Sequence, residues 1–219
     1  MLTVHHLNNS RSQRVLWLLE EIGVPYELVK YERDPKTMLA PPALQRIHPL
    51  GKSPVVVDGE DVIAESGAII EYLAERYGDG RFVPSKGSQD HLKCRYYMHY
   101  GEGSLMPLLL LRLIFNRIRT ARVPFFIKPI TKKIAGQVEG DFIQPNLARH
   151  VAFLDGELQK STWFAGNELT IADIQMVYPM GALAARYPEV PKSITNWVER
   201  VQQRPAFKRA EDRGGKTEF

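Results

Sequence analysis

The sequence predicts an α/β domain followed by an all-helical domain, and three observations support this. Over residues 1–80, short apolar runs alternate with segments of helical periodicity. After residue 89, the pattern contains long helical stretches and no convincing strand. Residues 79–88 read Asp-Gly-Arg-Phe-Val-Pro-Ser-Lys-Gly-Ser, and this glycine and proline content is typical of a linker. We therefore expect one domain at 1–80 and a second at 89–219.

The first domain begins with a strand, a helix and a second strand. Leu2–Leu7 is a short apolar run with strand character. From Ser12, apolar residues follow a helical period until Gly23. Tyr26–Tyr31 is the next predicted strand. A unit of this kind implies parallel strands joined by a right-handed crossover.

An irregular segment, a hairpin and a helix complete the first domain. Three prolines break residues 34–47, so we expect only a short helix at 42–46. Asp58-Gly59 is a two-residue hairpin signal between strands at 55–57 and 60–63. A helix then runs from Ser66 to Tyr77 and ends at Gly78.

In the second domain we expect helical stretches at 90–119, 125–161, 171–186 and 191–204. Thr170-Ile171-Ala172-Asp173 is a variant of the capping box. In this motif the Thr170 side chain caps the helix, and the Asp173 carboxylate accepts a hydrogen bond from the Thr170 amide. We expect this pair to have a structural role.

The composition is that of an ordinary globular protein, with 44% hydrophobic and 25% charged residues. A single cysteine, Cys94, excludes an intramolecular disulfide and a cysteine-rich metal site, and we expect it to be a small buried apolar residue. The N-terminus has no secretory signal pattern. The longest apolar run, Leu105–Leu111, is far shorter than the roughly 18 residues that a membrane span needs. These features predict a cytoplasmic protein.

The charge is uneven along the chain. The protein has a net charge of +4, but residues 105–138 contain seven lysines and arginines and no acid. They are Arg112, Arg117, Arg119, Arg122, Lys128, Lys132 and Lys133. The simplest interpretation is a solvated helix face; contact with an anionic ligand or a membrane surface is the alternative. Nucleic-acid binding is not predicted, because no known nucleic-acid motif accompanies the charge.

Two places in the first domain have the properties of a ligand site. Pro54 lacks an amide hydrogen yet opens an apolar strand, and this predicts a cis Ser53–Pro54 bond. Such a turn would direct the Ser53 backbone groups outward, toward a peptide-like ligand. Ser10 lies just before a helix N-terminus, a position that favours anions. From the local sequence alone, Ser10 or Ser12 could simply cap that helix.

These segments resemble the cytosolic glutathione transferases, and the order of strands and helices resembles a thioredoxin-like fold. The resemblance rests on Pro49-Leu50-Gly51-Lys52-Ser53-Pro54 and on Glu65-Ser66 before a helix. The run from Ser10 to Glu20 and the run Pro41-Pro42-Ala43-Leu44 resemble a microbial serine-type subgroup found in bacteria and fungi. His48 departs from the asparagine that is commonest before this proline, and we interpret it as a turn residue.

The resemblance implies that Ser10 is the catalytic residue. Its hydroxyl would donate a hydrogen bond to the glutathione sulfur, stabilise the thiolate and lower the thiol pKa. Asn9 and Ser12 lie within one turn and could share or replace this role. Some serine-type classes also have an arginine one turn later, which is Arg14 here.

The resemblance also implies the glutathione-binding residues. Lys52 would contact the glycyl carboxylate, and Ser53 would bind the cysteinyl part through its backbone beside Pro54. Glu65 would hold the γ-glutamyl ammonium group and Ser66 the γ-glutamyl carboxylate. For Lys52, Glu65 and Ser66 the alternative is a plain turn or cap residue.

The implied reaction is attack of glutathione thiolate on a small hydrophobic electrophile, as in detoxification, or reduction of an organic hydroperoxide. Glutathione would be the co-substrate, no metal is implied, and the protein would be a homodimer. The electrophile site would lie between the domains, although its candidate residues suit core or dimer packing equally well. These candidates are Tyr97, Tyr100, Met106, Leu109 and Leu113. The alternative function is a non-catalytic binding or scaffold module with the same fold. A disulfide reductase would need Cys94 or a bound glutathione disulfide to react.

Overall fold

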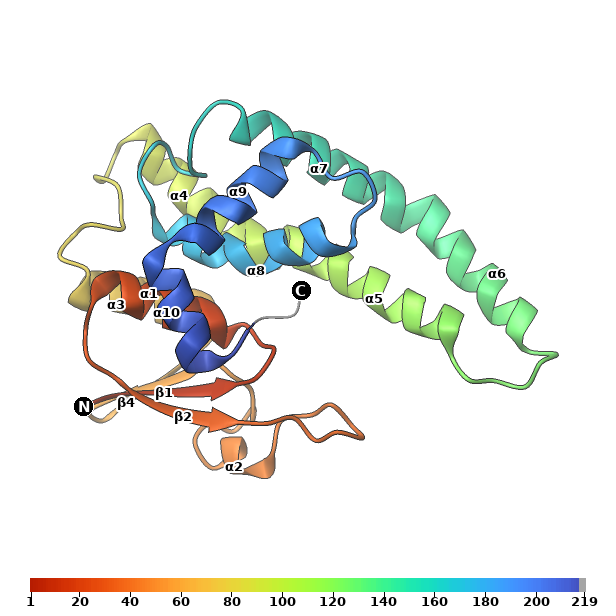
Figure 1. The fold of residues 1–219 in the computed structure, drawn as a ribbon, viewed down its shortest axis with the longest axis horizontal. Helices are drawn as coiled ribbons and strands as arrows, with labels where there is room; N and C mark the ends of the chain where they lie inside the picture. Colours follow the sequence, from red (N-terminus) through yellow and green to blue (C-terminus); the bar gives the residue numbers. More distant parts are fainter. Residues whose placement is uncertain (217–219) are drawn as a thin grey trace.

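A computed structural model describes residues 1–216. Its N-terminal part contains a four-stranded sheet in the order β2-β1-β3-β4. The strands are β1 (Leu2–Leu7), β2 (Glu27–Tyr31), β3 (Val55–Asp58) and β4 (Asp61–Ala64). β1 and β2 are parallel, whereas β3 is antiparallel to both β1 and β4. Figure 1 shows α1 (Ser12–Ile22) and α3 (Ser66–Tyr77) above the sheet, with α2 (Pro42–Gln45) below it. This is a thioredoxin-like arrangement.

The predicted elements of this part are confirmed, with one correction. The hairpin turn consists of Gly59 and Glu60, one residue later than expected, because Asp58 still pairs with Asp61. Gly59 has a φ of 64°, a left-handed conformation that glycine adopts without strain. The predicted helix at residues 12–22 ends at Gly23, whose φ is 84°.

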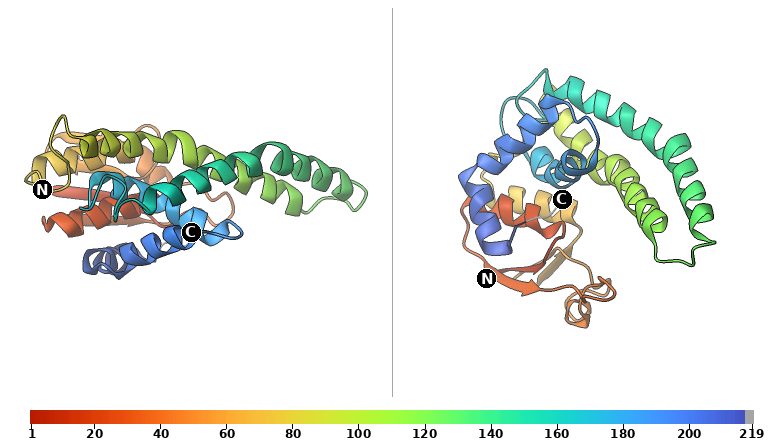
Figure 2. Two further views of the ribbon diagram at one scale, coloured as in Figure 1. Left: turned by 90° about the horizontal axis from the view of Figure 1, so that it is seen from above. Right: turned by 45° about the vertical axis from the view of Figure 1, so that its right-hand side comes forward.

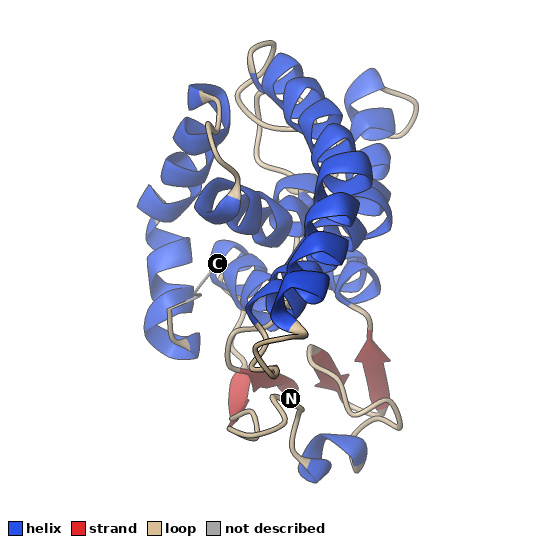
Figure 3. Ribbon diagram, turned by 90° about the vertical axis from the view of Figure 1, so that its right-hand side faces the viewer, coloured by secondary structure: helices blue, strands red, loops and turns tan. Residues whose placement is uncertain are grey.

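The rest of the described chain is helical (Figure 3). The successive elements are α4 (Gln89–Tyr100), η1 (Gly101–Leu105), α5 (Met106–Thr120), α6 (Lys128–Val138), η2 (Glu139–Ile143), α7 (Gln144–Leu158), α8 (Ile171–Arg186), α9 (Lys192–Gln203) and α10 (Pro205–Gly214). None of these helices combines the length and apolar character that would let it cross a bilayer.

The helical prediction needs three corrections. The stretches expected at 90–119 and 125–161 are each interrupted by one turn of π-helix, η1 and η2. The second stretch begins at Lys128 rather than at 125. A further helix, α10, follows Arg204, where we expected the helical pattern to stop. Pro205 begins this helix instead of ending one, because the first helical position requires no amide hydrogen.

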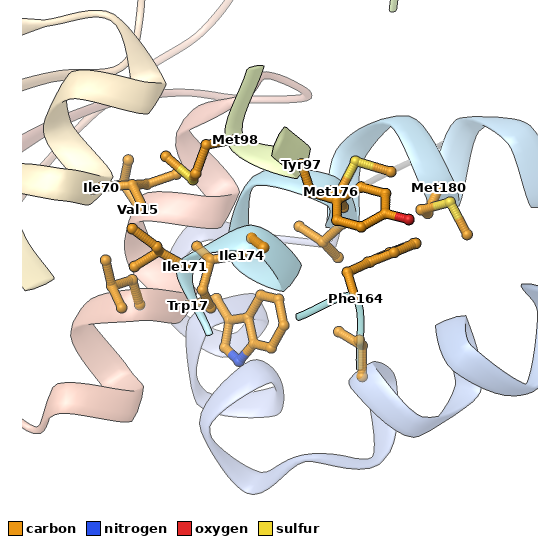
Figure 4. Packing of buried hydrophobic residues seen from close by; sticks show 14 of the residues in the cluster. Val15, Trp17, Ile70, Tyr97, Met98, Phe164, Ile171, Ile174, Met176 and Met180 are labelled. Atoms are coloured by element: carbon orange, nitrogen blue, oxygen red, sulfur yellow. The ribbon is translucent and has the colours of Figure 1, made fainter. Parts of the chain in front are cut away.

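The helices that cover the sheet and the helices of the C-terminal part share one hydrophobic core, which includes much of α8. Figure 4 shows Val15 of α1 and Ile70 of α3 close to Ile171 of α8 and Met98 of α4. The Thr170–Asp173 capping box at the start of α8 is present. The fully buried Asp173 carboxylate accepts hydrogen bonds from the backbone amides of Thr170 and Phe164.

Two features at the edges of the molecule matter below. α10 packs against α1, and two ion pairs support this contact. Arg209 of α10 pairs with Glu20 of α1, and Arg204, which directly precedes α10, pairs with Glu21 of α1. On the opposite side, α5 and α6 form a long antiparallel pair that extends beyond the rest of the molecule (Figure 2).

Candidate active site

A cavity of about 260 Å³ lies beside the sheet, where the β1–α1 turn, the segment before β3, the β4–α3 junction and η1 meet. The residues that line it are Arg11, His48, Leu50, Lys52, Ser53, Pro54, Ala64, Glu65, Ser66 and Glu102. Five residues that the sequence predicted to bind a ligand are therefore together in one cavity. Ser10, the predicted catalytic residue, is not among the lining residues.

The Ser53–Pro54 peptide bond is cis, as predicted. The Ser53 hydroxyl donates a hydrogen bond to the His5 carbonyl at 2.9 Å and accepts one from the Leu7 amide at 3.0 Å. Pro54 has no amide hydrogen to donate to β1. The Ser53 side chain therefore makes the hydrogen bonds to β1 at this position, just before β3 begins. Its backbone amide and carbonyl, rather than its hydroxyl, are the groups suited to a ligand.

At the β4–α3 junction, Glu65 has a φ of 71° and directly precedes the first residue of α3. Ser66 is buried, and the first turn of α3 contains no acidic side chain. The free amides of a helix N-terminus carry partial positive charge, which stabilises a nearby anion. Exposed Glu65 and Lys52 add one negative and one positive charge to the same cavity.

Ser10 is the outer end of a buried chain of hydrogen bonds. Its Oγ lies 2.7 Å from Ser12 Oγ, and Ser12 Oγ lies 2.8 Å from His6 Nδ1. His6 Nε2 lies 2.9 Å from the Gly214 carbonyl oxygen, at the end of α10. Burial lowers the pKa of His6, which favours its neutral form.

The direction of each hydrogen bond in this chain follows from the bond between His6 and the Gly214 carbonyl. A carbonyl only accepts, so His6 Nε2 carries the proton and donates to Gly214. His6 Nδ1 therefore accepts from the Ser12 hydroxyl, and Ser12 Oγ accepts from Ser10. Ser10 Oγ also accepts from the Ser12 amide at 3.2 Å. Of the two alternatives to Ser10, Ser12 is fully buried and Asn9 is exposed.

An ion cluster around Glu102 forms part of the cavity wall. Both carboxylate oxygens of Glu102 accept a hydrogen bond from Arg11 Nε at 2.9 Å, and one also accepts from Arg14 Nη2 at 2.9 Å. Arg14 Nη1 donates to Gln175 of α8 at 2.6 Å. Burial lowers the pKa of the fully buried Arg14 to about 10, and the Glu102 charge opposes that shift. The cluster connects α1, η1 and α8 directly beside the cavity.

The sequence pattern did not identify Arg11 or Glu102 as site residues. Glu102 lies in Gly101-Glu102-Gly103, which the sequence analysis placed inside the helical stretch at 90–119 without a role of its own. In the structure these residues begin the π-helical turn η1. Such wide turns occur often at functional sites, but their position depends on tertiary contacts.

A second cavity, of about 280 Å³, lies between α5, α6, η2 and α8. Leu109 and Leu113, two of the predicted electrophile-site residues, line it together with Arg112, Arg119 and Arg186. Tyr97 and Tyr100 are instead buried, and their rings pack against Phe153 of α7, which is itself exposed. Met106 is buried in the core.

The chain matches two family models, "Glutathione S-transferase, N-terminal domain" over residues 1–75 and "Glutathione S-transferase, C-terminal domain" over residues 119–205. It is 36% identical over 216 residues to glutathione S-transferase 3 of Schizosaccharomyces pombe, which covers 97% of this chain and 88% of that protein. Over 217 residues it is 31% identical to glutathione S-transferase 1 of Saccharomyces cerevisiae, covering 94% of this chain and 92% of the relative.

A solved structure supports the same assignment. The crystal structure of a glutathione S-transferase from Actinobacillus pleuropneumoniae superposes with a TM-score of 0.77 at 29% identity, and covers 99% of this chain and 94% of its own. The agreement thus includes both the sheet-containing part and the helical part. The chain belongs to the glutathione S-transferase family, whose members are transferases.

Proposed function

We propose that this transferase binds glutathione in the 260 Å³ cavity and directs its thiolate at a hydrophobic electrophile. The single observation that carries the proposal is that Lys52, Ser53, Pro54, Glu65 and Ser66 line one cavity, although they come from two separate segments. Lys52, Ser53, Glu65 and Ser66 each offer a group that matches one part of glutathione, a peptide-like molecule with two carboxylates and one ammonium group, and the cis bond to Pro54 fixes the Ser53 turn. In this proposal no metal takes part.

The binding contacts follow from the charge of each group. Lys52 pairs with the glycyl carboxylate, and the Ser53 backbone pairs with the cysteinyl amide and carbonyl. The γ-glutamyl carboxylate lies at the N-terminus of α3 beside Ser66, where the free amides favour an anion. Glu65 holds the neighbouring ammonium group.

In this proposal Ser10 stabilises the sulfur anion without losing its own proton. In the resting arrangement the Ser10 hydroxyl donates to Ser12. When the thiolate is bound, rotation about the Ser10 Cβ–Oγ bond exchanges this neutral hydrogen bond for a charge-assisted one to sulfur. The thiol proton leaves to solvent, the thiolate forms a bond to the electrophilic carbon, and the leaving group departs with its electron pair. In the reduction of an organic hydroperoxide, the same thiolate would attack the terminal peroxide oxygen, the O–O bond would break to release the alcohol, and a second glutathione would convert the resulting sulfenic acid to glutathione disulfide and water.

The second cavity is our candidate for the electrophile site. Tyr178 of α8 lies under both Arg11 and Arg14, at 5.8 Å and 5.6 Å from ring centroid to guanidinium carbon. Ala182, one helical turn further along α8, lines the second cavity. Its lining is about half apolar, which suits the hydrophobic part of an electrophile, and the arginines among its lining residues favour an anionic or strongly polar substituent.

We also propose that the protein is a homodimer that acts in the cytoplasm. Leu92 and Tyr96 on α4 are 60% and 49% exposed, and they line a shallow groove of about 450 Å³ with His99 and Tyr100. An exposed apolar groove of this kind is typical of a protein contact surface. Light scattering should give the mass of two chains, and Leu92→Glu with Tyr96→Glu should halve it. The lone buried Cys94 suits a reducing compartment.

The decisive experiment measures glutathione binding and the pKa of the bound thiol in the same samples. Calorimetry should show micromolar-to-millimolar binding, and thiolate absorbance should titrate about one to two pH units lower than in free glutathione. Ser10→Ala should keep binding but raise the thiol pKa again and lower kcat about ten- to a hundredfold. Ser85→Ala, at an exposed serine, is the matched control.

Three outcomes separate the alternatives. If glutathione does not bind, the proposal is wrong. If it binds with an unshifted thiol pKa and no conjugation of an activated aryl chloride, the protein is the binding or scaffold module instead. If Ser12→Ala raises the thiol pKa more than Ser10→Ala does, Ser12 holds the sulfur.

A further inference from the structure

The α5–α6 pair, whose connection at residues 121–127 we call the hairpin tip, extends beyond the rest of the molecule (Figures 1 and 2). Glu102, which lines that cavity, precedes α5, whereas the hairpin tip follows it. At 1.5 Å per residue, the 15 residues of α5 separate the two ends by about 22 Å. The hairpin tip is therefore remote from the proposed chemistry.

The hairpin tip exposes large apolar side chains. Phe125 is 85% exposed and Phe126 is 64% exposed, and their rings contact each other edge to face at 5.6 Å. On α6, Ile130 and Ile134 continue this surface at a helical spacing and are 58% and 53% exposed. A further exposed stripe on α5 consists of Leu110, Ile114 and Ile118. Contiguous exposed apolar side chains of this kind mark an interaction surface.

The same region is strongly cationic. Arg112 forms an ion pair with Glu139 at the base of the hairpin. The other six cations of residues 105–138 form no ion pair with an acid in the described part of the chain. They are Arg117, Arg119, Arg122, Lys128, Lys132 and Lys133. Arg122 and Lys128 flank the two phenylalanines in the sequence.

We propose that the hairpin tip docks on the surface of an anionic lipid bilayer. A bilayer of this kind is negative at its headgroups and apolar just beneath them, which matches two exposed phenylalanines with cations on both sides of them in the sequence. A purely ionic partner would neutralise the cations but would leave Phe125 and Phe126 without an apolar environment. Because no described helix could cross a bilayer, the association is peripheral and reversible.

The orientation follows from the shape of the molecule. With the hairpin tip in the headgroup layer, α5 and α6 rise from the surface, and the glutathione cavity stays in water at the other end of α5. The second cavity, which lies along α5 and α6, is then nearer to the lipid than the glutathione cavity is. Hydrophobic electrophiles concentrate in bilayers, so this arrangement would bring the enzyme close to such molecules.

The test uses the full chain with sedimented vesicles, either of phosphatidylcholine alone or with a third of the lipid replaced by phosphatidylserine. Binding should require phosphatidylserine and should weaken strongly as salt is raised. Lys128→Glu with Lys132→Glu should weaken it at least about 25-fold, at roughly fivefold per cation removed. Phe125→Ser with Phe126→Ser should weaken it at least about tenfold.

Two matched variants control for general effects. Lys86→Glu with Lys208→Glu makes the same charge change at exposed positions elsewhere, and Met38→Ser with Leu39→Ser removes an exposed apolar pair from another loop. Both should bind vesicles like the wild type. A Phe126→Trp variant reports insertion directly, because its added fluorescence should shift to the blue on anionic vesicles and be quenched by brominated lipid.

Several results would overturn the proposal. One is absence of binding to phosphatidylserine vesicles by the folded wild-type protein. Another is binding that the lysine variant abolishes and the phenylalanine variant does not, since this would mean a purely ionic contact with no insertion. If the phenylalanine variant instead changes the oligomeric state in light scattering, the hairpin tip contacts a second copy of the chain rather than lipid.

Discussion

Replacing Glu102 with glutamine should destabilise the protein, because it removes the negative charge shared by two arginines. Glu102 accepts hydrogen bonds from Arg11 and Arg14 at 2.9 Å. Arg14 is fully buried, and its other hydrogen-bond partner, Gln175, is neutral. The substitution would therefore leave a buried guanidinium charge without a counter-charge.

The magnitude follows from burial. Removing one partner of a fully buried ion pair costs about 3–5 kcal/mol. The Glu102 side chain is 29% exposed, so water already weakens the pair, and we expect a loss of about 2–3 kcal/mol. For a chain of 219 residues this corresponds to a decrease in Tm of about 4–12 °C.

The assay is a double-mutant cycle in urea unfolding at one protein concentration. Its variants are Glu102→Gln, Arg14→Met and the double substitution, which removes both charges. The double variant should be more stable than the sum of the single losses predicts, by at least about 1 kcal/mol. Glu75→Gln on the exposed face of α3 is the control, and its effect should stay within about 0.5 kcal/mol. Additive losses, or a Glu102→Gln effect as small as the control, would refute the reasoning.

Three further predictions concern the ligand, pH and packing. Lys52→Ala should raise the glutathione KM about three- to tenfold with kcat unchanged, since Lys52 is exposed; an unaltered KM in steady-state kinetics would contradict its role. Burial lowers the pKa of His150, so its stabilising contribution is present above about pH 6.5 and is lost as the pH falls. Below that pH the unfolding free energy of the wild type should therefore decrease more steeply than that of His150→Gln, by up to about 1.4 kcal/mol per pH unit; equal slopes in urea titrations would count against this. Gly214→Ala should cost about 1–3 kcal/mol, because its Cβ would lie 2.5 Å from Leu16 Cδ1. Gly156→Ala, which meets no atom within 4 Å, should be neutral or slightly stabilising in the same melts.

Local patterns were enough to predict the sheet part and half of the site. The helix at 12–22 follows from its apolar spacing and from Gly23, and both act within a few residues. The cis Ser53–Pro54 turn follows from a proline at the start of a strand. Lys52 and Glu65 were found through the resemblance to the glutathione transferases, because they stand in the short motifs on which that resemblance rests.

The remainder depends on contacts between distant parts of the chain. Glu102 is held beside the cavity by hydrogen bonds from Arg11 and Arg14, which lie 91 and 88 positions away in the sequence. The helix α10 has few apolar residues, and it is held on α1 by Phe207 and by ion pairs to Glu20. Periodicity alone does not reveal an element whose stability comes from docking rather than from its own sequence.

The contact between Gly214 and His6 has a consequence for the order in which the protein matures. The two residues are 208 positions apart, yet the Gly214 carbonyl sets the tautomer of the imidazole behind Ser12 and Ser10. During synthesis the sheet and α1 can form long before residues 205–214 leave the ribosome. In a nascent chain, the residues that line the proposed glutathione cavity would then be in place before the His6 proton is fixed on Nε2. Docking of α10 would thus fix the direction of the hydrogen bonds between Ser10, Ser12 and His6 late, after the residues that line the cavity have been made.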